Sequence, residues 1–103
     1  MGDPKNMERI KVICINKDGG NHSNPHEAIS NFGWVDPLGR KGIWTLAQMI
    51  SWLERGNAAY VQDRAGNIAW CGVRLSAYQN KYVQTHADNS WNNNLLSLTE
   101  CLV

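Results

Sequence analysis

Three short runs of alternating apolar and polar side chains constrain the fold of this chain more than any other feature. The runs are Ala58–Asp63, Ile68–Leu75 and Lys81–His86, joined by Arg64–Asn67 and Ser76–Asn80. The joining segments carry Gly, Asn and Ser, which favour tight turns. Because successive side chains of a strand point to opposite faces, the pattern predicts a three-stranded antiparallel meander.

The alternation sorts the side chains of this meander onto two faces. The face expected to cover a core is small and apolar, and comprises Ala59, Val61, Ala69, Cys71, Val73, Leu75 and Val83. The candidate interaction face comprises Tyr60, Trp70, Arg74, Tyr82, Gln84 and His86, with Gln62 and Ile68 beside them. Such a face can dock a protein or a second copy, stack the bases of single-stranded nucleic acid, or be covered by Trp91 and the leucines after it.

The first half of the chain predicts one strand and a short helix. Arg9–Lys17 contains the run Val12–Ile15, which is short, β-branched and apolar on both faces, so it predicts a central strand. Asn24 is a good N-cap, and Pro25 suits the first position of a helix that Gly33 would end.

A second helix is predicted after a loop over residues 34–42. Thr45 and Gln48 have the spacing of a capping box, and Gly56 follows the helix. The apolar stripe of this helix is Leu46, Met49, Ile50 and Leu53. Residues 91–98 are consistent with either a short strand or a helical turn.

These elements predict an α+β domain over residues 9–103, preceded by a disordered segment at residues 1–8. The order β-α-α-β-β-β favours a sheet of about four strands, mainly antiparallel, with two helices packed on one face. Two small layers with separate cores are the alternative arrangement.

The balance of charge argues against a strongly polyanionic partner. Ten Lys and Arg face nine Asp and Glu, a net charge of +1, and the basic residues are scattered. No apolar stretch approaches the roughly 18 residues of a membrane span, and Met1–Asn6 lacks the apolar core of a signal peptide.

The three cysteines are widely spaced and odd in number, which does not indicate a disulfide framework. We interpret Cys14, Cys71 and Cys101 as reduced thiols of a cytoplasmic protein, the first two packed in strands and the last near an exposed end. Without a C-x-x-C pair, no zinc site is predicted, and we assign no metal, no cofactor and no catalytic residue.

The loop between the first strand and the first predicted helix is a candidate ligand site. Its residues are Asp18, Gly19, Gly20, Asn21, His22 and His26. Two glycines followed by a helix N-terminus can gather backbone N–H groups around a phosphate or carboxylate. A tight turn before a well-capped helix explains the same residues without a ligand.

The motif Cys14-Ile15-x-x-Asp18-Gly19-Gly20-Asn21-His22-x-Asn24-Pro25-His26-Glu27-Ala28-Ile29 resembles a family of short bacterial and archaeal proteins of unknown function. The resemblance extends over residues 10–101 and implies a prokaryotic domain, but no activity. We therefore expect a small binding or interaction module, with a protein partner or self-association ahead of nucleic acid. A small-ligand or anion-binding, hydrolase-like enzyme at the Gly-Gly-Asn-His loop is the alternative.

Overall fold

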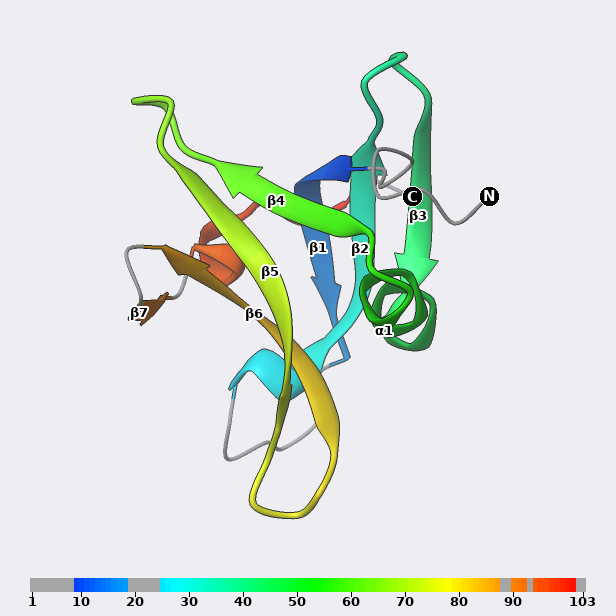
Figure 1. The fold of residues 1–103 in the computed structure, drawn as a ribbon, viewed down its shortest axis with the longest axis vertical. Helices are drawn as coiled ribbons and strands as arrows, with labels where there is room; N and C mark the ends of the chain where they lie inside the picture. The colour runs from blue at the N-terminus through cyan, green and yellow to red at the C-terminus, as the bar shows by residue number, and fades with distance from the viewer. Residues whose placement is uncertain (1–8, 19–24, 88–89, 93, 102–103) are drawn as a thin grey trace.

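The computed structural model describes residues 9–18, 25–87, 90–92 and 94–101, so the disorder expected for residues 1–8 lies outside the described part. The strands are β1 (Arg9–Lys17), β2 (Ile29–Val35), β3 (Lys41–Thr45), β4 (Ala58–Gln62), β5 (Ile68–Leu75), β6 (Lys81–Ala87) and β7 (Ser90–Asn92). The helical elements are the 3₁₀ turns η2 (Pro25–Ala28) and η3 (Leu95–Ser97) and the α-helix α1 (Leu46–Glu54) (Figure 1).

The strands form one seven-stranded sheet in the order β3-β2-β1-β4-β5-β6-β7. β1 pairs in parallel with β4, and every other neighbouring pair is antiparallel. The expected α+β fold, with about four strands and two helices, is therefore wrong. The described chain is a mixed, mostly β-sheet domain with one α-helix. The central position of β1 and the β4-β5-β6 meander agree with the sequence pattern.

The helix expected from Pro25 to Gly33 is only a single 3₁₀ turn, which leads directly into strand β2. The segment Ile29–Val35 reads Ile-Ser-Asn-Phe-Gly-Trp-Val, and its β-branched, aromatic and Gly residues are poor helix formers. Ile29 and Phe32 are both buried although three residues apart. The β1–β2 register shifts between Asn16 and Lys17. Such an irregularity lets two side chains three residues apart in one strand face the same side, as they would in a helix.

The loop expected over residues 34–42 is shorter than predicted, because residues 34–35 belong to β2 and residues 41–42 to β3. Its turn is confined to Asp36–Arg40, where Asp36 N–H donates to the Arg40 carbonyl and Gly39 N–H to the Asp36 carbonyl. Gly42 suggests a loop, but it lies within β3. The indole of Trp34 covers it, and a β-carbon there would come within 2.5 Å of that ring.

The same five-residue turn recurs at Asp63–Asn67 and Ser76–Asn80, with identical backbone hydrogen bonds. In each turn the first side chain accepts hydrogen bonds from the third and fifth backbone N–H groups. The fourth residue takes a positive φ, at Gly39, Gly66 and Gln79. One local solution thus closes three hairpins of the sheet.

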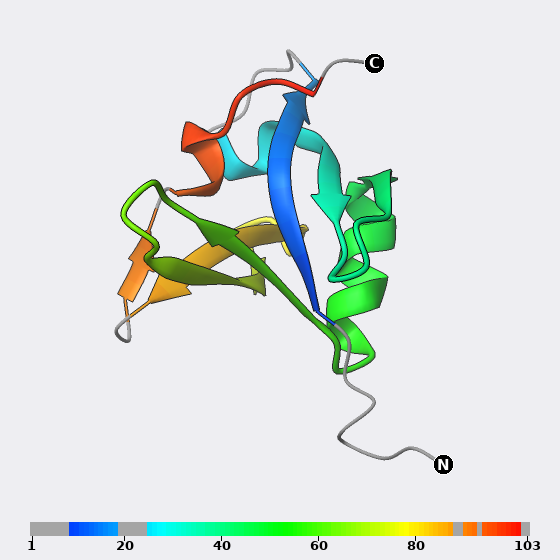
Figure 2. The same cartoon turned by 90° about the horizontal axis from the view of Figure 1, so that it is seen from above.

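The sheet curls around a single core, so that β4 crosses in front of β1 and β2 in Figure 1. β1 and β4 pair only from Arg9 with Ala58 to Lys11 with Tyr60. Further along, residues 99–101 take the place of β4 beside β1, as Figure 2 shows. The buried core comprises Ile10, Val12, Ile15, Ile29, Phe32, Met49, Ala59, Val61, Cys71, Val83 and Leu95.

Helix α1 forms as the sequence predicts and closes one side of this core. Thr45 Oγ1 accepts from Gln48 N–H, and Thr45 N–H donates to Gln48 Oε1, which completes the capping box. Met49 is fully buried, and α1 packs against β2 to β6. The ambiguous segment at residues 91–98 supplies both β7 and η3.

Candidate functional site

A row of four rings crosses the outer face of β4, β5, β6 and β7. Tyr60 is paired with Trp70, Trp70 with His86, and His86 with Trp91, so each ring belongs to the next strand of the sheet. The ring centroids of Tyr60 and Trp70 lie 5.5 Å apart, and those of His86 and Trp91 lie 5.0 Å apart. The strand register therefore brings four rings from residues far apart in sequence onto one face of the sheet.

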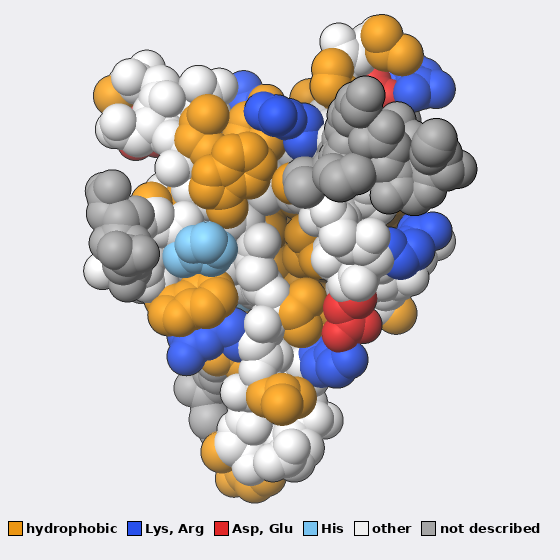
Figure 3. All heavy atoms as spheres, in the orientation of Figure 1, with side chains coloured by type: hydrophobic (Ala, Val, Ile, Leu, Met, Phe, Trp, Pro, Cys, Tyr) orange, Lys and Arg blue, Asp and Glu red, His pale blue; other side chains and the backbone are white. Residues whose placement is uncertain are grey.

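Basic side chains lie at both ends of this row. The Arg9 guanidinium is 6.0 Å from the Trp70 ring centroid, and that of Arg74 is 4.5 Å from the Trp91 centroid. Lys11 is the register partner of Tyr60. We call these seven residues the aromatic stripe: Tyr60, Trp70, His86, Trp91, Arg9, Lys11 and Arg74. Figure 3 shows hydrophobic, histidine and basic side chains following one another on this face.

Arg74 is held in place by a short chain of hydrogen bonds. Its Nη1 donates to Gln84 Oε1 at 2.8 Å, and Gln84 Nε2 donates to the Asn92 carbonyl at 3.1 Å. Gln84 thereby joins the cation on β5 to the backbone of β7. The guanidinium is positioned before any ligand arrives, which lowers the entropy lost on binding.

Burial divides the candidate interaction face into accessible and inaccessible members. Trp91 is 44% exposed, whereas Tyr82 is 5% and Gln84 9% exposed. Tyr60, Trp70, Arg74 and His86 are half-buried. Tyr82 and Gln84 thus support the surface from beneath rather than line it. On the opposite face the predicted core residues are buried or half-buried, except Leu75, which is 57% exposed near the end of the β5–β6 hairpin.

Of the residues expected to cover the interaction face, only Trp91 lies on it. Its ring lies over Gly72, where a β-carbon would come within 3.0 Å of it. The leucines behind it do not join it there, because Leu95 is fully buried and Leu96 and Leu98 pack against the core. Trp91 is therefore part of the exposed surface. Gly72 lies within β5, and a glycine inside a strand is the sequence signal for a close approach of another group.

The sequence reading missed Arg9 and Lys11, and it expected Trp91 only as part of a cover over this face. The two basic residues lie on β1, and only the parallel pairing of β1 with β4 brings them to the meander. Asp36 borders this end of the stripe, but its carboxylate accepts hydrogen bonds from Arg40 Nε at 2.6 Å and from the Arg40 backbone N–H at 2.8 Å. The charges of the stripe itself are all basic.

The candidate ligand loop is described only at its two ends. Gly19, Gly20, Asn21 and His22 lie outside the described residues, whereas Asp18 N–H donates to the Ala28 carbonyl at 2.8 Å. His26 lies in η2 and is buried, with its ring 6.1 Å from that of Tyr82. Burial, and then the positive charge of Arg74, lower the pKa of His26 from 6.5. Because η2 is a four-residue 3₁₀ turn, the α-helix N-terminus expected to attract an anion is absent from Pro25–Ala28.

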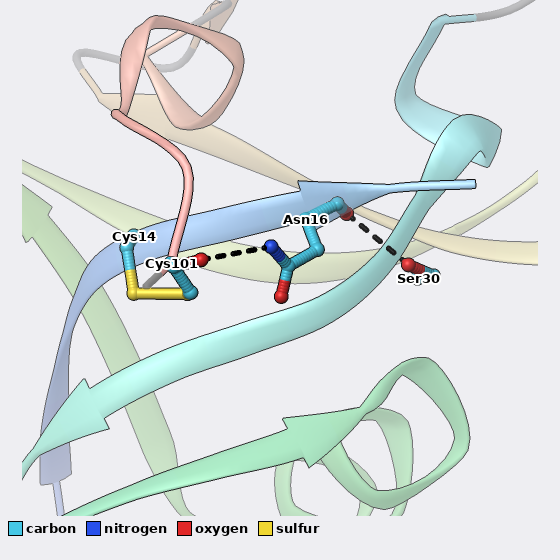
Figure 4. The surroundings of a disulfide bond; sticks show 4 residues. All are labelled: Cys14, Asn16, Ser30 and Cys101. Carbon is cyan, nitrogen blue, oxygen red and sulfur yellow. Dashed lines mark hydrogen bonds between the residues drawn. A yellow bond between two sulfur atoms is a disulfide. The ribbon is translucent and has the colours of Figure 1, made fainter. Parts of the chain in front are cut away.

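The cysteines differ from the predicted set of reduced thiols. Cys14 on β1 and Cys101 form a disulfide, with Cα atoms 4.9 Å apart (Figure 4). Cys101 is 5% exposed, not at the surface. Cys71 is a free, buried thiol as expected, and burial raises its pKa to about 12. The spacing argument failed because the fold brings the segment after η3 beside β1, and so joins residues 87 positions apart.

No three His, Cys, Asp or Glu side chains gather into a group that would hold a metal ion within the described ranges. Among the same residues, none of the helices has the length and apolar character needed to cross a membrane.

Comparison with known proteins places the chain in a family. Neither the curated proteins nor the solved structures contain a significant match. A family model described as "Protein of unknown function (DUF3892)" matches residues 11–99, which include nearly all of the sheet. The chain belongs to this family of unknown function, DUF3892.

Proposed function

We propose that this protein is a small binding module that takes up single-stranded nucleic acid on the aromatic stripe. The observation that carries the proposal is the combination of four cross-strand rings with three basic side chains on one outer sheet face. Every base has a π-face, so rings on an open sheet bind single strands with little sequence preference.

The composition of the stripe favours nucleic acid over an apolar protein partner. Protein interfaces usually centre on a desolvated apolar cluster. Here Ile68 lies at the margin, and the accessible centre consists of rings, an imidazole and guanidinium groups. The overall charge of +1 had argued against nucleic acid, but Arg9, Lys11 and Arg74 converge on this one face.

The number of cations sets the expected salt dependence. If Arg9, Lys11 and Arg74 each neutralise one phosphate, log K falls with log salt with a slope of about −2 for a single strand. Affinity should then fall about 20-fold between roughly 50 and 200 mM salt.

Fluorescence anisotropy with labelled poly-dT and poly-U of about twelve nucleotides tests the proposal directly. We expect Trp70→Ala and Trp91→Ala each to weaken binding about tenfold, since stacking contributes roughly 1–3 kcal/mol per base. Arg74→Gln should weaken binding and make the salt slope shallower by about 0.7. Arg55→Gln, an exposed arginine after α1, is the matched control and should leave both unchanged.

Two results would overturn the proposal. One is affinity for the single strands that is unaffected by Trp70→Ala and Trp91→Ala, or is absent at millimolar protein. The other is concentration-dependent dimerisation in sedimentation that Trp91→Ala abolishes, which would make the stripe a self-association surface. Circular dichroism of each variant verifies that the sheet is intact.

We also propose that the protein is prokaryotic, that the Cys14-to-Ile29 motif is the signature of its family, and that the protein is cytoplasmic. Because Cys14 and Cys101 form a disulfide, the cytoplasmic location no longer rests on three reduced thiols. In that compartment stable disulfides are rare, and those that form are usually transient or redox-sensing.

A further inference from the structure

The C-terminal residues are attached to β1 by a small set of contacts centred on the disulfide. Ile15 N–H donates to the Thr99 carbonyl at 3.0 Å, and Cys101 N–H donates to the Ile15 carbonyl at 3.1 Å. Asn16 Nδ2 adds a bond to the Cys101 carbonyl at 3.3 Å, which Figure 4 shows beside the disulfide. These bonds close the edge of β1 that β4 leaves open.

The fold provides a niche for the two sulfur atoms. Gly33 of β2 is the register partner of Cys14, and a β-carbon at this position would clash with Cys14 Sγ and approach Cys101 Sγ within 2.8 Å. Only glycine leaves this space on the outer face of β2. The niche belongs to a surface hollow of about 260 Å³ lined by Ile13, Cys14, Gly33, Trp34, Lys41, Gly42, Ile43 and Cys101.

The two cysteine residues differ in exposure. Cys14 is half-buried at this hollow, whereas Cys101 is buried. Ile13 and Ile43, at its rim, are 37% and 42% exposed. Because disulfide exchange depends on access, we expect a thiolate from solvent to attack at the more exposed residue, Cys14.

The segment before Cys101 also forms one wall of a cleft. This cleft, of about 360 Å³, lies where β1 and β4 diverge. Ile13 and the residues Val61–Arg64 line one side, and Asn94 and Ser97–Thr99 line the other. Leu95 is fully buried and anchors the near end of this wall, so the disulfide and the hydrogen bonds to β1 secure the far end.

We propose that Cys14–Cys101 is a thiol–disulfide exchange site whose reduction releases residues 99–101 from β1 and opens this cleft. A dithiol reductant supplies the electrons. One of its thiolates attacks Cys14 Sγ, the Sγ–Sγ bond breaks, and Cys101 leaves as a thiolate that takes up a proton. The second thiol of the reductant then displaces Cys14 from the mixed disulfide. The protein gains two thiols and the reductant becomes a disulfide.

Amide hydrogen exchange of the full-length chain, with and without dithiothreitol, tests the release. On reduction, the amides of Ile15 and Cys101 should lose at least about tenfold in protection, because their partners are the released contacts. The amide of Asp18 is the control. Asp18 directly follows β1, but its N–H donates to the Ala28 carbonyl and not to residues 99–101. Its protection should therefore change less than about twofold.

Alkylation of the native protein gives an independent measurement. Two cysteines should become reactive after reduction and none before it, since Cys71 is buried with a raised pKa. The Cys14→Ser/Cys101→Ser variant should match the reduced wild type at Ile15. Reduction that requires denaturant, unchanged protection of Ile15, or loss of protection throughout the sheet would each overturn the proposal.

Discussion

The two tryptophan clusters of this protein use the same residue type for different purposes. Trp34 of β2 and Trp44 of β3 pack with Trp52 of α1, with centroid distances of 4.9 and 5.2 Å. Trp70 and Trp91 lie on the outer face of β5 and β7 instead. In both clusters one indole covers a glycine: Trp34 covers Gly42, and Trp91 covers Gly72.

The difference lies in what covers each cluster. The first is half-buried and packs against the core, and its Trp52, from α1, donates through Nε1 to the Ala58 carbonyl at 3.0 Å. The second has arginines over its rings and no helix above it in the described chain. Ring clustering alone therefore does not tell rings that pack on the core from rings that face outward. The groups packed against the rings make the difference.

Truncating one ring of each cluster should produce the largest contrast. Trp52→Ala removes both packing and a hydrogen bond, and should lower the free energy of unfolding by about 3 kcal/mol. Trp91→Ala should lower it by less than about 1 kcal/mol, because the ring is largely exposed on one side. Urea denaturation measures both. Equal losses would mean that the outer cluster is part of the core.

The two covered glycines sharpen the comparison. Gly42→Ala places a methyl group within 2.5 Å of the Trp34 ring, which packs on Trp44, and should destabilise the protein by about 1–3 kcal/mol. Gly72→Ala approaches Trp91 to 3.0 Å, but that ring can move outward. Its effect on thermal unfolding should be within about 0.5 kcal/mol, while nucleic-acid binding weakens. A large loss of stability with Gly72→Ala would show that Trp91 is fixed.

The titration of His26 reports on the Arg74 end of the open cluster. Burial and Arg74 lower its pKa below 6.5, so below pH 6.5 the unfolded chain binds a proton that the folded protein does not. Stability is therefore full above pH 6.5 and falls on acidification, by at most about 1.4 kcal/mol per pH unit.

Arg74→Gln should raise the pKa of His26 toward 6.5 and make the stability less sensitive to acid. Addition of poly-dT should raise this pKa in the wild type, because phosphate offsets the charge of Arg74. NMR titration of the His26 ring measures both effects, with Arg55→Gln as the control. An unchanged His26 pKa in Arg74→Gln would contradict the electrostatic link.

The smallest expected effect compares turns from the two halves of the sheet. Gly39 takes φ 86° in the turn between β2 and β3, whereas Gln79 takes φ 66° in the turn between β5 and β6. A non-glycine residue in this region is strained, so Gln79→Gly should raise the free energy of unfolding by about 0.5–1 kcal/mol. Thermal denaturation measures the gain; a loss would mean that the Gln79 side chain is itself engaged.

Sequence patterns predicted the elements whose signals are local. The period-two runs gave β4, β5 and β6, and the Thr45–Gln48 spacing gave the start of α1. The segment Ile29–Val35 was misread because its apolar spacing resembles a helix and only its irregular pairing with β1 explains it. The alternation within the meander predicted part of the aromatic stripe. Arg9 and Lys11 join it through the parallel pairing of β1 with β4, which no local sequence pattern predicts.

The pairing of β1 with residues 99–101 has a consequence for how fast the chain reaches its final form. The disulfide partners are 87 positions apart, and the parallel β1–β4 pairing is also distant in sequence. Contacts of such long range lose loop-closure entropy before they contribute stability, so mixed sheets like this one fold slowly. During synthesis, the end of β1 remains without its second neighbour until residues 99–101, which follow η3, have emerged.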